Sequence, residues 1–319
     1  MIVRTFGLCV LAGVCATAQA LWTEPRPSTV SHWTWGPGGQ EMAPRPPFAF
    51  VKERLGGSNP KVEVKDAAGR HWVVKFGSES HTDTFAVRLL SAVGYAAVPT
   101  FYVERGSIEG VQGLKRAKRF VSRDGSFRGG RFKLHVKGSA DDDGSETWSW
   151  NANPFVGSRE LGGLKILVML TSNWDTKDAR DGKGSSNTGI IHSGSNAQYA
   201  VTDWGATFGK YGTFFRRNRW DWGGYRIQTA NFVKMSKAGA LEWGFKGKHT
   251  QDITTGVGVA DVVWLDRYLS QITDEDLAAG FAASGASQPV AREYSRLMRE
   301  RILQLERVAQ AKGGERAAK

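Results

Sequence analysis

The chain has 319 residues, of which 40% are hydrophobic and 23% are charged, with 43 Lys and Arg against 31 Asp and Glu. This composition is that of a folded globular protein, and it excludes an intrinsically disordered chain, a collagen and a polytopic membrane protein. The length allows one large domain or two medium ones, with enough chain to bury a sizeable core.

The first twenty residues differ from the rest of the chain. An apolar run at residues 6–14 follows a basic residue, and Ala18 and Ala20 then have the spacing that signal peptidase prefers. The apolar run is shorter than the roughly 20 residues that a transmembrane helix needs. We therefore predict that residues 1–20 are a cleaved signal peptide, that Leu21 is the mature N-terminus, and that the protein is exported to the periplasm or the extracellular space.

Both cysteines of the chain, Cys9 and Cys15, lie inside this segment. The mature chain would therefore contain neither disulfides nor reactive thiols, and its stability would depend on its core. The exported protein would also be basic, which favours an acidic partner or surface. No membrane-spanning segment is predicted after cleavage of the signal.

The next part of the chain divides into a linker and a strand-rich unit. Residues 21–47 hold six of the ten prolines and lack periodicity, so we predict a Pro-rich linker without helix or strand. We assign residues 48–137 to a strand-rich unit, because short alternating segments are separated there by Gly and Asx turns. A helix is predicted over 82–93, which ends before Gly94. Strands are expected at 48–51, 61–65, 71–76, 99–103 and 113–121.

Residues 138–319 are predicted to form a larger, helix-rich unit. Apolar side chains at helical spacing predict a helix over 158–171, and the same pattern recurs three times near the C-terminus. These later helices are expected at 261–272, 274–284 and 290–311. The sequence thus predicts an α+β protein in which a small strand-rich unit precedes a helical one.

Polar residues that could carry chemistry stand at three places. Lys75 lies within a predicted strand, and Asp175 and Lys177 directly follow the first helix of the second unit. These last two could provide a general base and a cation that binds phosphate. Asp203 ends an apolar segment two residues before Gly205, an arrangement that can present a carboxylate to a metal ion.

In this order, the motifs resemble the strand lysine, the catalytic-loop D-x-K and the D-F-G of the protein-kinase-like superfamily. The wider pattern is similar to a group of uncharacterised exported bacterial proteins with kinase-like features, and more distantly to phosphatidylinositol kinases, HipA-like kinases and secretory-pathway Golgi kinases. The resemblance covers about residues 48–210 and includes Gly57-Ser-Asn-Pro-Lys61 and Asn153-Pro-Phe-Val-Gly-Ser-Arg-Glu-Leu161. It implies a protein-kinase-like two-lobed fold, in which a small antiparallel β lobe with one helix precedes a larger, mainly helical lobe.

The resemblance also implies that ATP and Mg²⁺ bind between the two lobes. Lys75 would hold the α- and β-phosphates, and Asp83 would fix its ammonium group, with Glu79 as the rival for that position. A glycine-containing loop would cover the phosphates with backbone N–H groups, although such a loop also serves as a plain hairpin turn. This loop contains Gly56, Gly57 and Ser58.

In the second unit, Asp175 would accept the proton of the substrate hydroxyl, Lys177 would neutralise the transferred phosphoryl group, and Asp203 would bind Mg²⁺. The acceptor molecule is not indicated by the sequence. The alternative for this loop is a solvated turn without catalytic function.

One position departs from the family pattern. The metal-binding Asn expected five residues after Asp175 is Arg180, which cannot coordinate a cation. Asp181 and Asn187 lie in the same loop, and either could replace the missing ligand. If neither does, the second metal site is lost, which favours a pseudokinase.

Other polar residues indicate structural or binding roles. Arg159 and Glu160 are expected to form a structural ion pair, and the six histidines are too scattered for a zinc site. Residues 115–137 and 214–222 mix basic and aromatic side chains, which can grip phosphates or be plain solvated surface. Export argues against nucleic acid as the partner and leaves an anionic lipid or envelope polymer.

Two hypotheses follow from the sequence. The first is an exported kinase-like phosphotransferase that binds a nucleotide and Mg²⁺ between its lobes and transfers a phosphoryl or nucleotidyl group to an acceptor. The second is a pseudokinase-type binding module that recognises an anionic component of the envelope and has no enzymatic activity.

Overall fold

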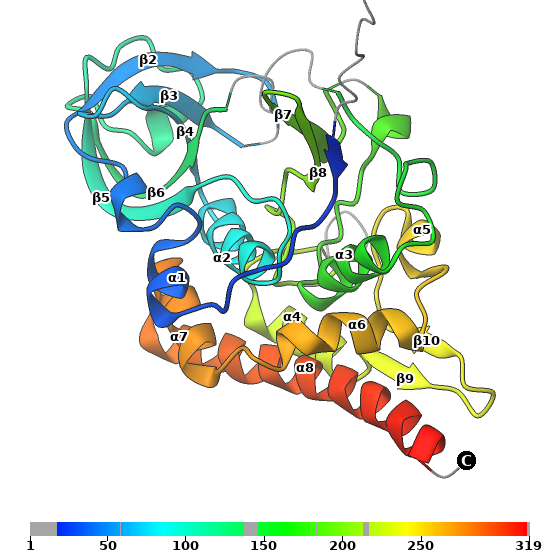
Figure 1. The fold of residues 1–319 in the computed structure, drawn as a ribbon. Coiled ribbons are helices and arrows are strands. Elements are labelled where there is room, and N and C mark those ends of the chain that lie inside the picture. Colours follow the sequence, from blue (N-terminus) through cyan, green and yellow to red (C-terminus); the bar gives the residue numbers. More distant parts are fainter. Residues whose placement is uncertain (1–17, 58, 137–145, 183, 213–216, 318–319) are drawn as a thin grey trace, which may run out of the picture.

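The computed structural model describes residues 18–57, 59–136, 146–182, 184–212 and 217–317. It shows an α+β protein with a small strand-built part and a larger helical part (Figure 1). In the first part, strands close into a barrel in the order β2-β3-β4-β6-β5. These strands are β2 (Phe48–Arg54), β3 (Lys61–Lys65), β4 (His71–Phe76), β5 (Thr100–Glu109) and β6 (Ser126–Leu134).

The barrel follows from the alternation of apolar and polar residues along its strands. In β4, the side chains of Trp72, Val74 and Phe76 join the buried core of the barrel. Successive side chains of a strand point to opposite faces, so Lys75 points away from that core. Arg131 of β6 is the direct neighbour of Lys75 across the ladder and therefore shares its face.

Helix α2 (Glu79–Ala92) lies beside the barrel and is buried along most of its length. It begins three residues before the predicted start, so Thr82 belongs to its first turn. The earlier start places both Glu79 and Asp83 on the helix, four residues apart and therefore on one face.

One further expectation for this part is corrected by the structure. The strand predicted at 113–121 is absent from the described residues there, where the chain forms a loop with a 3₁₀ turn (Ala117–Arg119). The fifth strand of the barrel is β6, which lies within the basic stretch and pairs with β4 and β5. The boundary expected at 137 and 138 lies outside the described residues.

The segment predicted as an irregular linker contains helix α1 (Val30–Trp35) and is packed against the rest of the protein. Its Trp33 is fully buried against Phe85 of α2. Arg88, also buried in α2, donates hydrogen bonds to the backbone oxygens of Trp33 and Thr34. The segment therefore follows a defined path, which burial of Trp33 and the hydrogen bonds of Arg88 tie to α2.

Only the end of the predicted signal peptide is described, because residues 1–17 lie outside the described ranges. Ala18–Ala20 form strand β1, which pairs in parallel with β8 (Asn196–Val201). β8 also pairs with β7 (Thr188–Ser193) in antiparallel orientation. Leu21, the predicted mature N-terminus, is buried.

The helical part has its own core, formed mainly around α3 (Arg159–Leu170) and α8 (Gln288–Ala317). The long helix α8 runs along the base of the molecule, beside α7 (Asp274–Ala283) and α6 (Val259–Leu269) (Figure 1). The four helices predicted for this part are confirmed, with small shifts of their ends. The remaining elements are α4 (Trp222–Thr229), β9 (Val233–Met235), β10 (Leu241–Trp243) and α5 (Thr250–Thr254).

Among the described residues, no helix combines the length and the apolar character that are needed to cross a bilayer.

Candidate functional site

A polar cleft lies where the β2–β3 loop, β4 and α2 face the segments that flank β7 and β8. It collects most of the residues that the sequence singled out, from positions more than one hundred residues apart. The lining residues are Gly57, Asn59, Lys61, Lys75, Glu79, Asp175, Lys177, Gly184, Ser185, Ser186, Asn187, Thr202, Asp203, Ala206 and Arg219.

Lys75 joins the two sides of this cleft. Its Nζ lies 3.2 Å from Oδ2 of Asp203 and 3.7 Å from Oε2 of Glu79. The ammonium group is almost buried, with the residue 8% exposed, so it depends on these two carboxylates for compensation. Glu79, the rival in the sequence analysis, is therefore the helix acid that contacts Lys75.

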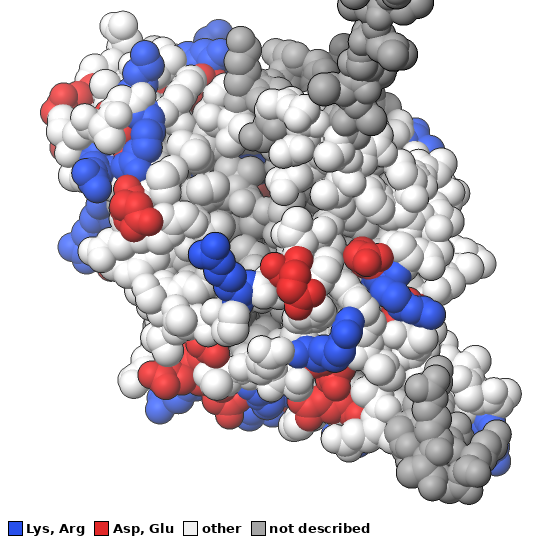
Figure 2. Space-filling view, viewed as in Figure 1, with Lys and Arg blue, Asp and Glu red and all other residues white. Residues whose placement is uncertain are grey.

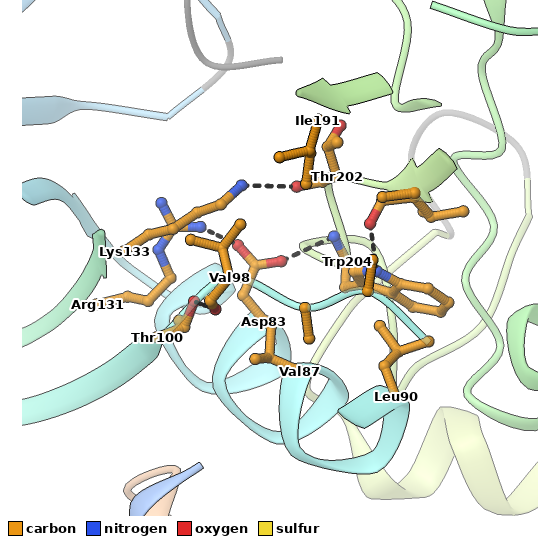
Figure 3. Close-up of a pocket in the computed structure, with 14 residues that line it drawn as sticks. Asp83, Val87, Leu90, Val98, Thr100, Arg131, Lys133, Ile191, Thr202 and Trp204 are labelled. Atoms are coloured by element: carbon orange, nitrogen blue, oxygen red, sulfur yellow. Dashed lines mark hydrogen bonds and ion pairs between the residues drawn. The ribbon is translucent and has the colours of Figure 1, made fainter. Parts of the chain in front are cut away.

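Asp83 has a different partner from the one that the resemblance implied. Its carboxylate forms an ion pair with Arg131 and accepts a hydrogen bond of 2.7 Å from the backbone N–H of Trp204 (Figure 3). No contact between Asp83 and Lys75 occurs in the described part of the chain. Successive side chains of β6 point to alternate faces, and Arg131 faces α2. There it forms an ion pair with Asp83, which lies one turn after Glu79. The cofactor-binding role assigned to Asp83 is thus not supported by its contacts.

Asp203 presents a partly exposed carboxylate to the cleft, with 36% of its side chain accessible. Burial acts to raise the pKa of Asp203, but the positive charge of Lys75 and the N–H of Gly205 outweigh burial and hold this pKa below its ordinary value. Gly205 allows close packing here, because a Cβ atom at this position would lie 2.7 Å from Cδ of Glu79. The glycine therefore lets the segment after Asp203 lie directly against α2.

Asp175 is held between two lysines on the opposite side of the cleft. Its Oδ2 lies 3.3 Å from Nζ of Lys177, and its Oδ1 lies 3.4 Å from Nζ of Lys248. The sequence motif predicted the first neighbour, whereas Lys248 was missed because it comes from a loop more than seventy residues later. The backbone fixes this loop, since the N–H of Lys248 donates to the oxygen of Trp174.

Asn187 lines the cleft together with Asp203, as one of the two alternatives expected from the sequence. Its Nδ2 donates a hydrogen bond of 2.5 Å to the backbone oxygen of Asp175. Its backbone N–H donates to Lys177, and its backbone oxygen accepts from Thr202. These contacts leave the side-chain oxygen of Asn187 as the atom available to a ligand.

Arg180 and Asp181 do not line the cleft. The guanidinium of Arg180 binds the carboxylates of Asp178 and Asp252. Asp181 accepts hydrogen bonds from the backbone N–H of Asp178 and from His249, so its contacts are those of a capping residue and do not support a metal role in the cleft. Asp178, Asp181 and His249 lie near one another, but these arginine and histidine contacts already satisfy the two carboxylates. The cationic charge of Arg180 is thus removed from the cleft.

The glycine loop has one described residue in the cleft lining, Gly57, which has a positive φ of 80°. Gly56 is described but does not line the cleft, and Ser58 lies outside the described residues. Arg116 fixes the loop by donating hydrogen bonds to the backbone oxygens of Leu55 and Gly57. Part of the basic stretch therefore has a structural function.

Two other cations of the basic stretches are also engaged inside the protein. Lys133 donates a hydrogen bond of 2.9 Å to the backbone oxygen of Thr202, and Arg131 holds Asp83 (Figure 3). On the face shown in Figure 2, Lys and Arg side chains lie over the barrel with some Asp and Glu side chains between them, and both signs of charge also mix over α7 and α8. Lys137 and residues 213–216 lie outside the described ranges.

Arg219 is a cleft residue that the sequence analysis treated only as part of a basic stretch. Its guanidinium forms an ion pair with Glu79, the same acid that contacts Lys75. It also lies over the ring of Trp174, at 5.4 Å from the ring centroid. The signal in the sequence was weak, because nothing near Arg219 marks it apart from its basic and aromatic neighbours.

The structural ion pair expected at Arg159 is formed with a different acid. Nη1 of Arg159 lies 2.7 Å from Oδ1 of Asp261, the capping residue of α6. The neighbouring Glu160 contributes its backbone oxygen, which accepts a hydrogen bond from the hydroxyl of Tyr95.

No protein-family model matches the chain, and no curated protein matches it.

Proposed function

We propose that this protein is an exported, kinase-like phosphotransferase that binds ATP in the cleft and transfers a phosphoryl group to a hydroxyl of an acceptor molecule. The observation that carries the proposal is the placement of Lys75 between Glu79 and Asp203. A strand lysine, a helix acid and a carboxylate after a strand meet here in the way that phosphoryl transfer requires. In this proposal the barrel with α2 is the small lobe, and the helical part is the large lobe.

The charges around the cleft suit a polyphosphate. Lys61, Lys75, Lys177 and Arg219 line it with positive charge, against Glu79, Asp175 and Asp203. Cations that are already positioned in a partly desolvated site bind phosphate oxygens more strongly than solvated cations do. Lys75 would hold the inner phosphates, and the loop with Gly57 would lie over them.

The donor set also fits Mg²⁺. The carboxylate of Asp203 and the amide oxygen of Asn187 face one cleft, and oxygen ligands of these two kinds are those that Mg²⁺ prefers. Bound there, Mg²⁺ would neutralise phosphate charge. Asp203 is suited to this role because its pKa is held low, so it remains ionised at neutral pH.

Asp175 is placed to act on the acceptor. It lines the cleft with 22% of its side chain exposed, so the accessible part of its carboxylate can accept a hydrogen bond from a substrate hydroxyl. As the acceptor oxygen forms its bond to the γ-phosphorus, the bond from that phosphorus to ADP breaks, and the hydroxyl proton passes to Asp175. Lys177, 3.3 Å from Asp175, would neutralise the phosphoryl group during transfer.

Binding is the first test. Purified protein should show a rise in melting temperature with ATP that requires Mg²⁺. Asp203→Asn should abolish the Mg²⁺-dependent part of the rise, whereas Asp181→Asn, a matched change outside the cleft, should retain it. A melting temperature that does not respond to millimolar ATP and Mg²⁺ would contradict the proposal.

The transfer step is tested with labelled ATP and an extract of envelope components. Label from the γ-position, but not from the α-position, should appear in an acceptor and should disappear with Asp203→Asn. Label from the α-position would instead indicate transfer of a nucleotidyl group.

The excess of 43 Lys and Arg over 31 Asp and Glu supports a second candidate, a pseudokinase-type module that binds an anionic envelope polymer or lipid. This candidate predicts salt-sensitive binding to such a polymer without transfer of label. Metal-dependent transfer that Asp203→Asn abolishes would exclude it.

A further inference from the structure

Arg219 and Lys75 share one carboxylate at the edge of the cleft. Glu79 contacts Nζ of Lys75 through Oε2 and the guanidinium of Arg219 through Oε1. Lys75 has a second acid, Asp203, at 3.2 Å. For Arg219, Glu79 is the one carboxylate contact in the described part of the chain. The arginine is therefore the less completely compensated cation of the two.

The position of Arg219 is fixed toward the catalytic side of the cleft. Its guanidinium lies over the ring of Trp174, and Trp174 directly precedes Asp175 in the chain. Trp174 is itself buried, and its indole N–H donates a hydrogen bond to the backbone oxygen of Asn218. The tryptophan thus ties the segment before Arg219 to the loop that carries Asp175.

The guanidinium has the capacity for another partner. About 25% of the Arg219 side chain is exposed, and this residue lines the cleft together with Lys177 and Asp203. A guanidinium carries five N–H donors in a planar fork that matches two oxygens of a phosphate. Partial burial makes a new anionic partner more favourable than it would be at a fully solvated arginine.

We propose that Arg219 binds the terminal phosphate of the nucleotide and so makes the cleft selective for a nucleoside triphosphate over a diphosphate. This inference rests on the proposed function and goes beyond it by assigning the residue that distinguishes ATP from ADP. In this arrangement Lys75, deeper in the cleft, binds the inner phosphates. The terminal phosphate lies next to Asp175, on the side where Trp174 holds Arg219. Glu79 keeps Arg219 in place when the cleft contains no phosphate.

The test compares affinities for ATP and ADP, measured by calorimetry with Mg²⁺ present. Arg219→Gln should lower the ratio of the two affinities about tenfold by weakening ATP binding, because one charge-assisted contact is lost. Arg219→Lys should lower it less, because it keeps the charge but lacks the fork. Arg217→Gln is the matched control: Arg217 lies over the same Trp174 ring, at 5.3 Å, but is not a lining residue of the cleft.

The outcomes separate this inference from the function on which it rests. If the unaltered protein binds neither nucleotide, the proposed function fails, and the role of Arg219 fails with it. If it binds both nucleotides and Arg219→Gln leaves the ratio unchanged, only the role of Arg219 is overturned. Equal losses in the Arg219 and Arg217 variants would also overturn that role, because they would indicate a general effect of charge. Arg219→Lys provides the comparison if Arg219→Gln does not fold.

Discussion

Two acids of helix α2 lie one turn apart and experience different surroundings. Glu79 faces the open cleft, where it contacts Lys75 and Arg219. Asp83 faces the interior, where it contacts Arg131 and the backbone N–H of Trp204. Both acids pair with a cation from a barrel strand, and both lie against the segment that follows β8.

The difference lies in what remains available to a ligand. Asp83 and Arg131 are each at most 3% exposed, so their pair is closed and holds α2 against β6. In the cleft, the guanidinium of Arg219 and the carboxylate of Asp203 retain exposed surface, so these two groups can bind a ligand. We call Asp83 with Arg131 the closed pair, and Glu79 with Lys75 and Arg219 the open pair. The closed pair holds α2 in place and so supports the position of Glu79 in the open pair.

The largest effect should come from breaking the closed pair. Asp83→Asn removes the charge that compensates the guanidinium of Arg131 but keeps nearly the same side-chain volume. An unpaired buried charge costs about 3 to 5 kcal/mol, so the free energy of unfolding should fall by roughly that amount. Chemical denaturation at neutral pH measures it. A loss below about 1 kcal/mol would show that Arg131 finds compensation elsewhere.

The second prediction concerns Arg180, whose charge stabilises the fold but lies outside the cleft. Arg180→Ala leaves the fully buried Asp178 without its guanidinium partner, and the unfolding free energy should fall by about 2 kcal/mol. The Mg²⁺ concentration needed for nucleotide binding should not change, because Arg180 does not line the cleft. A Mg²⁺ titration at fixed ATP measures this, and a shifted curve would place Arg180 near the metal.

Local patterns in the sequence predicted much of this fold. Alternation located most barrel strands, and helical spacing located the helices of the second part, because both signals are contained in a few consecutive residues. The structure of residues 21–47 was missed, since prolines suggested a linker. Trp33 and Arg88 show why: the helix in this segment is stabilised by burial against α2 and by side-chain donors fifty residues away.

The residues of the candidate site that belong to a sequence motif were predicted. The residues that only tertiary contacts bring to the site were missed. Lys75, Asp175, Lys177, Asn187 and Asp203 do meet in one cleft. Spacing along the chain could not decide whether Lys75 pairs with Glu79 or with Asp83, because both acids lie on the same helical face. Only the position of Arg131, which pairs with Asp83, distinguishes the two. Lys248 and Arg219 enter the site from distant loops, which a single sequence does not place.

The open pair should respond differently from the closed one to the same kind of change. Glu79→Gln should lower the unfolding free energy by about 1 to 2 kcal/mol, less than Asp83→Asn, because Lys75 keeps Asp203 and a quarter of the Arg219 side chain is exposed to solvent. Transfer of label from ATP should nevertheless fall about tenfold, since the two cations lose the carboxylate that orients them. Rates of transfer and denaturation curves of one preparation give both values. A stability loss as large as that of Asp83→Asn would remove the distinction between the two pairs.

The smallest effect concerns Asp266 of α6, an acid that forms no ion pair with a cation among the described residues. Burial, together with the charge of Glu306, raises the pKa of Asp266 to about 6, and its Oδ1 accepts no hydrogen bond in the described structure. The ordinary value is 3.8, so the folded protein holds this proton more tightly than the unfolded chain does. Below both values the group is protonated in both states and costs nothing. As the pH rises from about 4 to about 6, the unfolded chain releases the proton first, and stability is lost.

Asp266→Asn should therefore stabilise the protein above pH 6 by about 1 kcal/mol, after allowance for its partial exposure to solvent, and should have little effect near pH 4. Denaturation curves at pH 4 and pH 8 measure the difference, with Glu242→Gln, a change at an exposed acid of β10, as the control. A gain of the same size at both pH values would mean that the amide improves packing or hydrogen bonding, and that ionisation is not the cause. A gain confined to high pH would show what burial costs an acid without the cation that Asp83 and Glu79 each have.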